Sequence, residues 1–104
     1  MVNEEIKIIK ERLQEIIQPH EMYLFGSFAK DTFTSESDFD FYLTVADNAG
    51  DIIGLSQKAY KSLRGIRTRP VDIIINYESV FKNRKNNDTL EKKVSEEGIL
   101  LYAK

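Results

Sequence analysis

Residues 22–45 of the chain, MYLFGSFAKDTFTSESDFDFYLTV, contain two strand patterns separated by a glycine-serine turn. The apolar run that opens this stretch stops at Gly26-Ser27, which predicts a strand followed by a sharp turn. From Asp38 to Val45 apolar and polar residues alternate, which predicts a second strand. Its phenylalanines then point to the core, and Asp38 and Asp40 leave the opposite face together.

The remaining sequence predicts helices that pack against a small sheet, an α/β fold. An apolar stripe at helical spacing predicts a first helix, with Asn3 as its N-terminal cap and Pro19 at its end. The stretch 48–51 ends the second strand and can cap a helix, for which Gly65 is a natural C-terminal cap. Pro70 opens a third strand, whose β-branched residues predict a central place in the sheet. The expected features are a stripe of Ile6, Ile9, Leu13, Ile16 and Ile17, a helix over 52–63, a strand over 71–75, a polar irregular stretch over 77–88, a helix over 89–97, and an apolar end over 99–102 that forms a strand or docks on the core.

Length and composition limit the class of protein. With 104 residues, of which 41% are hydrophobic and 31% charged, the chain is expected to form one globular domain over residues 1–104. It has no cysteine, which excludes disulfides and thiolate metal sites. Glu4 and Glu5 stand where a signal peptide would be positive, and no apolar run is long enough to span a bilayer, so we expect a cytoplasmic protein without membrane contact. The net charge of −2 argues against a dedicated duplex-binding module.

Three aspartates are candidates for chemistry. Asp38 and Asp40 are two residues apart in a strand, so their side chains leave one face about 6–7 Å apart. Asp72 stands in an otherwise apolar strand, where an unpaired carboxylate needs a cation or a strong donor. If the two strands are neighbours, three carboxylates converge, and such an oxygen-only set suits Mg²⁺ or Mn²⁺ rather than Zn²⁺. Taken singly, the aspartate pair is also common turn chemistry, and Asp72 could instead pair with Arg67 or Arg69 at a strand edge.

The order of three motifs resembles the signature of the polymerase-β-like nucleotidyltransferase superfamily. These motifs are Gly26-Ser27, then Ser37-Asp38-Phe39-Asp40, then Asp72 on an apolar strand. The segments 24–30 and 37–41 are similar to those of its small stand-alone members, the minimal nucleotidyltransferases, and residues 97–102 resemble the way those proteins end. The resemblance covers nearly the whole chain. It implies an α+β fold with a small mixed sheet and flanking helices, and the transfer of NMP, with AMP as the expected group, from an NTP to a hydroxyl.

The resemblance implies a phosphate-binding role for the turn. Gly26, Ser27 and the amides of their turn, at the start of a short helix, would hold the phosphates of ATP or another NTP. Lys30 would neutralise phosphate charge, unless it is simply an exposed lysine. Relatives commonly have a second glycine where this chain has Asp31, whose negative charge could weaken nucleotide binding.

The resemblance implies a metal-binding role for the aspartates. Asp38 and Asp40 would bind two Mg²⁺ ions, for which Mn²⁺ could substitute, and these would clamp the attacking and leaving oxygens. Asp72 would hold the catalytic metal and help to deprotonate the acceptor hydroxyl.

The acceptor side must come from elsewhere, because the chain is too short to include the helical acceptor-binding domain of larger relatives. Minimal members are typically paired with a small helical HEPN-type protein in prokaryotic toxin–antitoxin modules. By resemblance, this chain would be the antitoxin, and it would modify a tyrosine of that partner and silence its RNase activity. A second interpretation is a binding module that neutralises the partner by contact alone, with a vestigial metal site. A phosphohydrolase with an Asp-x-Asp pair fits worse, because that pair would follow the first strand and have a threonine where Tyr42 stands.

The other polar candidates have plainer interpretations. His20, the only histidine, is expected at the surface or in a turn. The apolar stripe of the first helix is expected to be core, with part of it free to face another subunit in a homo-oligomer. Two basic groups are expected in solvated loops, although they could reach phosphates, nucleic acid or a partner: Arg64, Arg67 and Arg69, and Lys82, Arg84 and Lys85.

Overall fold

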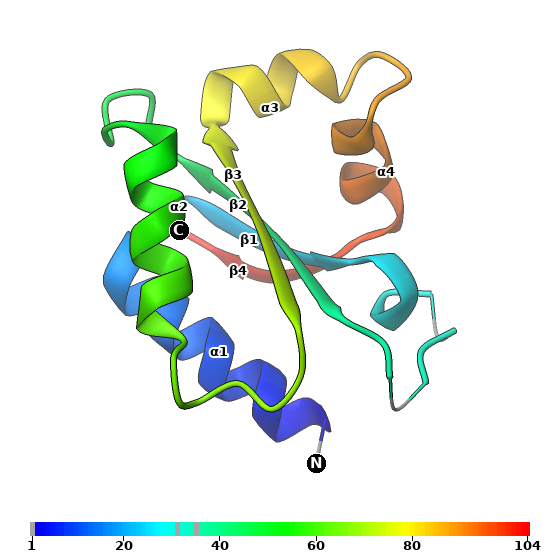
Figure 1. Cartoon of the computed structure of the whole chain (residues 1–104). Coiled ribbons are helices and arrows are strands. Elements are labelled where there is room, and N and C mark those ends of the chain that lie inside the picture. The colour runs from blue at the N-terminus through cyan, green and yellow to red at the C-terminus, as the bar shows by residue number, and fades with distance from the viewer. Residues whose placement is uncertain (1, 31, 35) are drawn as a thin grey trace.

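One sheet is the centre of the fold, and its strands are β1 (Glu21–Phe25), β2 (Phe39–Val45), β3 (Val71–Tyr77) and β4 (Ile99–Ala103). Their order across the four-stranded sheet is β3-β2-β1-β4 (Figure 1). β1 runs antiparallel to its neighbours β2 and β4, whereas β3 runs parallel to β2. The computed structural model describes residues 2–30, 32–34 and 36–104. The small mixed sheet with flanking helices confirms the predicted fold class.

Helices cover both faces of this sheet (Figure 1). α1 (Val2–Ile17) and α2 (Ile52–Ser62) pack on one face, and α3 (Glu78–Arg84) and α4 (Leu90–Glu97) pack on the other. α2 forms the crossover between β2 and β3, and such a connection is what parallel neighbours require. A 3₁₀ turn, η1 (Gly26–Phe28), follows β1 directly.

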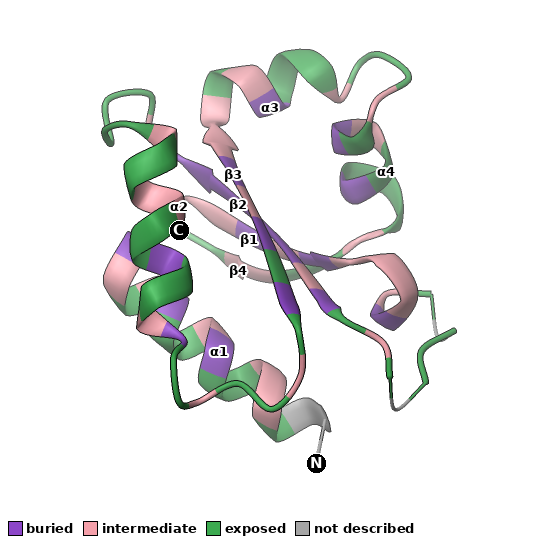
Figure 2. Cartoon of the chain, viewed as in Figure 1, coloured by how far each residue is buried: buried purple, intermediate pink, exposed green. Residues whose placement is uncertain are grey.

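The apolar face of β2 forms the main core, as its alternation predicts. Phe39 and Phe41 are completely buried in this core. The stripe predicted on the first helix meets them, because Ile9 and Leu13 of α1 are buried in the same cluster, and the other stripe residues pack in it or against it. Figure 2 shows the buried residues along the centre of the sheet and on the inner sides of the helices.

A second, smaller core lies on the opposite face of the sheet. Tyr42 of β2 is completely buried there, with Phe81 of α3 and Val94 of α4. The Tyr42 hydroxyl donates to Glu91 Oε2 at 2.7 Å, and Arg84 Nε donates to Glu91 Oε1 at 2.8 Å. These bonds satisfy a carboxylate that is only 5% exposed, and they tie α3 and α4 to β2.

The predicted central position of β3 is wrong, because β3 is an edge strand next to β2 alone. Its β-branched run reflects two covered faces instead. Val71, Ile73 and Ile75 are buried in the main core, while Ile74 packs against the smaller core on the other side. A strand between two helical layers is apolar on both faces even when it has a single neighbour.

The prediction that residues 77–88 are irregular is also wrong, because residues 78–84 form α3. Phe81 is the buried residue that holds this short helix on the sheet. Seven residues are too few for a helical period to be recognised in a polar sequence. Lys82 and Arg84 therefore lie on a helix, with Lys85 at its C-terminal cap, rather than in a loop.

The helix ends show local capping chemistry. Asp51 caps α2 by accepting from the Gly54 amide at 2.9 Å, as predicted, and α4 begins after Thr89. α2 ends at Ser62, and Gly65 lies beyond the cap residue in a left-handed backbone conformation, with φ of +82°. The cap predicted at Asn3 is wrong, because α1 begins at Val2 and Asn3 falls within it. In the described ranges, no helix is long and apolar enough to cross a membrane.

Candidate active site

Asp40 and Asp72 are directly opposite each other in the parallel pair of β2 and β3. Neighbouring strands lie about 4.8 Å apart, and residues in register point to the same face. Asp40 is half-buried, and Asp72, on the edge strand, is exposed. The condition for convergence, that these two strands are neighbours, is therefore met, and it brings together carboxylates that are 32 residues apart in sequence, from 40 to 72.

Gly26 brings the turn against the same carboxylate. Its φ is +77°, and a Cβ atom built on it would lie 2.5 Å from Asp40 Oδ2. Phe25, the residue before it, is in register with Asp40 across β1 and β2. Only glycine combines this backbone conformation with so close an approach. The turn after β1 therefore adjoins Asp40 of β2, which in turn stands opposite Asp72 of β3.

The electrostatics of the site show an excess of negative charge. Burial, then the charges of Asp72 and Asp38, and a side-chain hydrogen bond with Asp72 raise the pKa of the Asp40 carboxyl to about 6. A hydrogen bond between two carboxyls requires a proton on one of them. The raised pKa thus reflects burial of the carboxyl first, and then the like charges of the neighbouring aspartates.

The third carboxylate, Asp38, lies just before β2 and is exposed. Within the described ranges, no three His, Cys, Asp or Glu side chains are gathered closely enough to hold a metal ion as they stand. The donor chemistry nevertheless fits a hard cation, because the group consists of carboxylate oxygens whose repulsion a divalent ion would relieve. The assignment of Asp38, Asp40 and Asp72 as catalytic metal ligands stays a prediction.

The turn itself is short and closed by its own backbone. The Ser27 carbonyl accepts from the amides of Lys30 and Thr32, at 3.2 and 3.0 Å. Gly26 and Ser27 are half-buried at the start of η1, next to Asp40. Their predicted role in phosphate binding is not tested by this geometry and stays a prediction. Asp31, whose charge was expected to matter here, lies outside the described residues.

Lys30 does not point freely to solvent. Its Nζ forms an ion pair with Glu97 Oε1 of α4 at 2.9 Å, and both side chains are about half exposed. The pair lowers the pKa of the Glu97 carboxyl, mainly through the Lys30 hydrogen bond. Any phosphate held by Lys30 would therefore compete with Glu97.

Arg69 is a supporting residue that sequence reasoning missed. Instead of lying in a solvated loop, its side chain is 16% exposed, and its Nη2 pairs with Glu5 of α1 at 3.4 Å. Its guanidinium carbon lies 5.3 Å from the ring centroid of Phe28 and 4.8 Å from that of Phe39. Nη1 also donates to the carbonyl of Ser37 at 3.4 Å.

These contacts hold the turn against the strand that carries the aspartates. Phe28 belongs to η1, and Phe39 stands between Asp38 and Asp40, with the two rings 4.7 Å apart. A guanidinium on two ring faces is a favourable cation–π arrangement. The pairing considered as an alternative, Asp72 with Arg67 or Arg69, is not formed among the described residues. Its actual partner is far away in sequence, so no local spacing could have revealed it.

The remaining candidates lie away from the aspartates. His20 precedes β1 in a bend, as expected for a turn residue, and its Nδ1 contacts Glu78 Oε2. Lys82 pairs with Glu78 at 2.8 Å, which leaves this basic group partly neutralised. Arg64 and Arg67 are exposed beside the end of α2, as expected.

Comparisons with known proteins show the family and the fold of the chain. A family model described as "Nucleotidyltransferase domain" matches residues 6–101. A protein from Sulfolobus solfataricus, described as a candidate nucleotidyltransferase, has a similar structure, with a TM-score of 0.63, 19% identity, and coverage of 99% of this chain and 86% of that chain. A toxin–antitoxin structure with AMP-PNP has a TM-score of 0.55, 24% identity, and coverage of 96% of this chain and 73% of that chain. At these identities the two structures show a shared fold. No curated protein matches the chain.

Proposed function

Because this chain belongs to the nucleotidyltransferase domain family, we propose that it transfers a nucleoside monophosphate, AMP, from ATP to a protein hydroxyl. One observation carries the proposal: the Gly26 turn approaches the Asp40 carboxylate so closely that a Cβ would lie 2.5 Å from it, while Asp72 stands opposite Asp40. The turn proposed to bind phosphate and the proposed carboxylate ligands are thus neighbours. This is the arrangement that phosphoryl chemistry needs at a single phosphorus atom.

In the proposed reaction the acceptor hydroxyl attacks the α-phosphorus in line with the leaving group. A new oxygen–phosphorus bond forms to the acceptor, the bond from the α-phosphorus to the bridging oxygen breaks, and pyrophosphate leaves. The Asp72 carboxylate takes the hydroxyl proton, for which its exposed position on an edge strand provides access. The amides of Gly26 and Ser27 orient the phosphates for this displacement.

The carboxylates Asp38, Asp40 and Asp72 would hold Mg²⁺, in two ions, and Mn²⁺ would serve the same donor set. When bound, the metal neutralises phosphate charge and polarises the attacked phosphorus. The chain's own contribution is to keep the carboxylates of Asp40 and Asp72 together, and burial and then the neighbouring carboxylates raise the pKa of Asp40. Arg69 supports this arrangement by packing on the rings of Phe28 in the turn and Phe39 in β2.

The proposed biological role is that of the antitoxin in a toxin–antitoxin pair. A solved toxin–antitoxin structure with AMP-PNP has the same fold as this chain. The partner would be a small helical protein of the HEPN type, and the modified group would be a tyrosine hydroxyl on that partner. Modification of one partner residue would then silence the toxin.

A contact-only antitoxin is the second candidate. Two observations favour it: no three metal-ligating side chains are gathered in the described part of the chain, and Lys30 already pairs with Glu97. In this case the domain would neutralise its helical partner by binding alone. Loss of the aspartates would then leave neutralisation intact.

The test is transfer of label from α-labelled ATP, with Mg²⁺, to the proteins of a host extract that contains the product of the neighbouring gene. Asp38→Asn with Asp40→Asn should abolish the labelled band, and chelation of Mg²⁺ should do the same. Asp88→Asn, an exposed aspartate in the loop before α4, is the matched control and should leave labelling unchanged. If the wild type forms a stable complex with the partner but no label appears, the transfer proposal is wrong and the contact-only antitoxin is favoured.

A further inference from the structure

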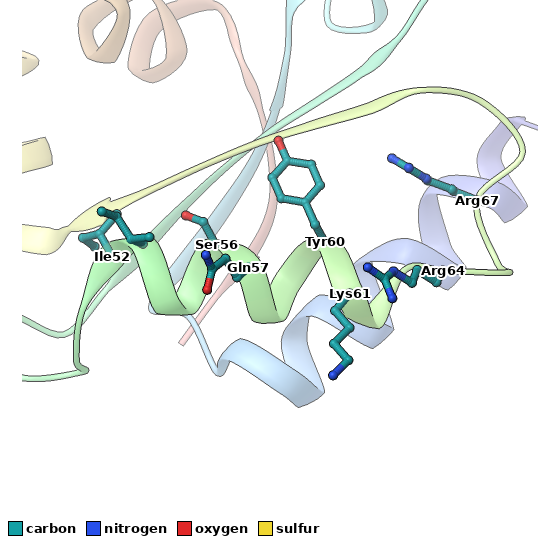
Figure 3. A pocket seen from close by; sticks show the side chains of 8 residues that line it. Ile52, Ser56, Gln57, Tyr60, Lys61, Arg64 and Arg67 are labelled. Atoms are coloured by element: carbon teal, nitrogen blue, oxygen red, sulfur yellow. The ribbon is translucent and has the colours of Figure 1, made fainter.

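A groove of about 690 Å³ runs along α2, and the carboxylates are not among the residues that line it (Figure 3). One part of its lining is apolar, with Ile53 exposed to 68% and Tyr60 to 37%. At the C-terminal end of α2 the lining becomes basic. The cations there are Lys61, Arg64 and Arg67.

The groove borders the edge strand of the sheet. Tyr60 reaches from α2 to β3, where its hydroxyl accepts from the Ile73 amide at 2.8 Å and donates to the Ile73 carbonyl at 3.3 Å (Figure 3). An edge strand normally offers these groups to an added strand. Because Tyr60 occupies them, a partner at this edge would meet side chains rather than extend the sheet.

The charges of the groove select one class of partner. Among the described residues, none of its three cations forms an ion pair, and its lining contains no acidic residue. The whole chain has a net charge of −2, so this basic surface stands out from an acidic protein. An apolar strip beside unpaired cations is complementary to a helix with one apolar face and acidic flanks.

The groove and the proposed general base lie on opposite faces of the same edge strand. Ile73, whose backbone Tyr60 caps, faces α2, whereas Asp72, the residue before it in β3, points to the other face. Because β3 is at the edge of the sheet, a protein seated along α2 could reach past this single strand to Asp72. We propose that this groove docks the acceptor protein through an acidic amphipathic helix, a proposal that rests on the proposed function. The groove thus supplies the acceptor site that the aspartates alone do not provide.

The test uses the full chain and a synthetic peptide of about 18 residues, long enough to form a helix in the groove. The peptide has leucines at helical spacing and glutamates elsewhere, and a second peptide has lysines in place of the glutamates. Fluorescence anisotropy measures binding, and amide chemical shifts of the labelled protein locate it. Arg64→Glu with Arg67→Glu should weaken binding about tenfold or more. Lys7→Glu with Lys10→Glu makes the same charge change at a different groove, between α1 and β4. This control should change the affinity for the acidic peptide by less than about threefold.

Shift changes confined to α2 and the loop before β3, with no binding of the basic peptide, would support the proposal. Ile53→Ser should weaken binding without affecting the fold, since this side chain is mostly exposed. Absence of binding, equal losses in the two charge-reversed proteins, or shift changes centred on β4 would each overturn it. Thermal unfolding of every variant confirms that the comparison concerns folded protein.

The same experiments separate this proposal from the transfer reaction. Asp38→Asn with Asp40→Asn should bind the acidic peptide as the wild type does, because these residues do not line the groove. If label transfer fails while the peptide binds in the groove, the proposed reaction is wrong and the docking surface stands. If transfer to the helical partner proceeds equally in Arg64→Glu with Arg67→Glu, the docking surface is wrong and the reaction stands.

Discussion

Gly26→Ala tests whether the turn and the carboxylates form one site. The new methyl carbon would lie 2.5 Å from Asp40 Oδ2, closer than real contacts allow, and the backbone would stay at φ of +77°. A left-handed conformation costs a non-glycine residue about 1–2 kcal/mol. Relief of the contact requires the Asp40 carboxylate, the end of a side chain, to rotate, which costs about 0.5–1.5 kcal/mol if it leaves its preferred rotamer.

Gly65→Ala is the matched control for the backbone term. Gly65 has nearly the same φ, +82°, but a Cβ there would meet nothing within 4 Å. Gly65→Ala should therefore show only the backbone cost of about 1–2 kcal/mol. Each kcal/mol by which Gly26→Ala lowers the free energy of unfolding beyond the loss in Gly65→Ala should lower Tm by about 4–8 °C in a domain of this size. Label transfer should fall far more in Gly26→Ala than in Gly65→Ala, because only the former displaces a proposed metal ligand.

A double-mutant cycle separates the contact from the strain. In an Asp40→Ala background the carboxylate is gone, so Gly26→Ala should cost no more than Gly65→Ala does. The measurements are thermal unfolding by circular dichroism and transfer from α-labelled ATP. Equal losses of stability and activity in the two glycine variants, or no relief in the Asp40→Ala background, would refute the reasoning.

Three further predictions concern the pH dependence, the sheet edge and the support of the turn. Without metal, the contribution of Asp40 to the stability should fall as the pH rises from 3.8 to about 6, since a carboxyl whose pKa is raised by folding favours the folded state only while protonated. Asp40→Asn should flatten this slope in thermal unfolding, and an unchanged slope would exclude Asp40 as its source. Tyr60→Phe removes the hydroxyl that caps Ile73, so the free energy of unfolding should fall by about 1 kcal/mol and hydrogen exchange at the Ile73 amide should speed up; wild-type protection would contradict this. Arg69→Met should lower the free energy of unfolding by about 1–3 kcal/mol and raise the KM for ATP. Arg69→Lys should recover only part of both losses, whereas full activity in Arg69→Met would mean that the turn is held without it.

Much of the site's local structure could be predicted from the sequence. The alternation in β2 placed Phe39 and Asp40 on opposite faces, and the break at Gly26-Ser27 ended β1 where the structure ends it. These features depend on backbone conformations of neighbouring residues and on the two-residue period of a strand. Such features can be predicted wherever a strand is long enough to show its two-residue alternation.

Other features escaped prediction because they depend on what covers a residue rather than on its neighbours in sequence. β3 has the composition of a central strand because helices cover both of its faces, yet it lies at the edge. α3 has a single buried residue, Phe81, so its sequence shows no helical repeat of apolar residues. Lys30 was expected to be free for phosphate or solvent, but Glu97 comes to it from α4.

The sequence by itself determined the turn at Gly26 and the side of β2 from which Asp40 leaves, because both follow from local backbone geometry. Only the tertiary structure decided that Asp72 stands opposite Asp40, since a parallel neighbour is reached through a crossover helix and not through a turn. The tertiary structure also decided that Arg69 packs on the turn, because its partners Glu5 and Phe28 come from distant parts of the chain. Residue spacing carries no information about contacts made at such separations, and these contacts are what join the turn and the carboxylates into one site.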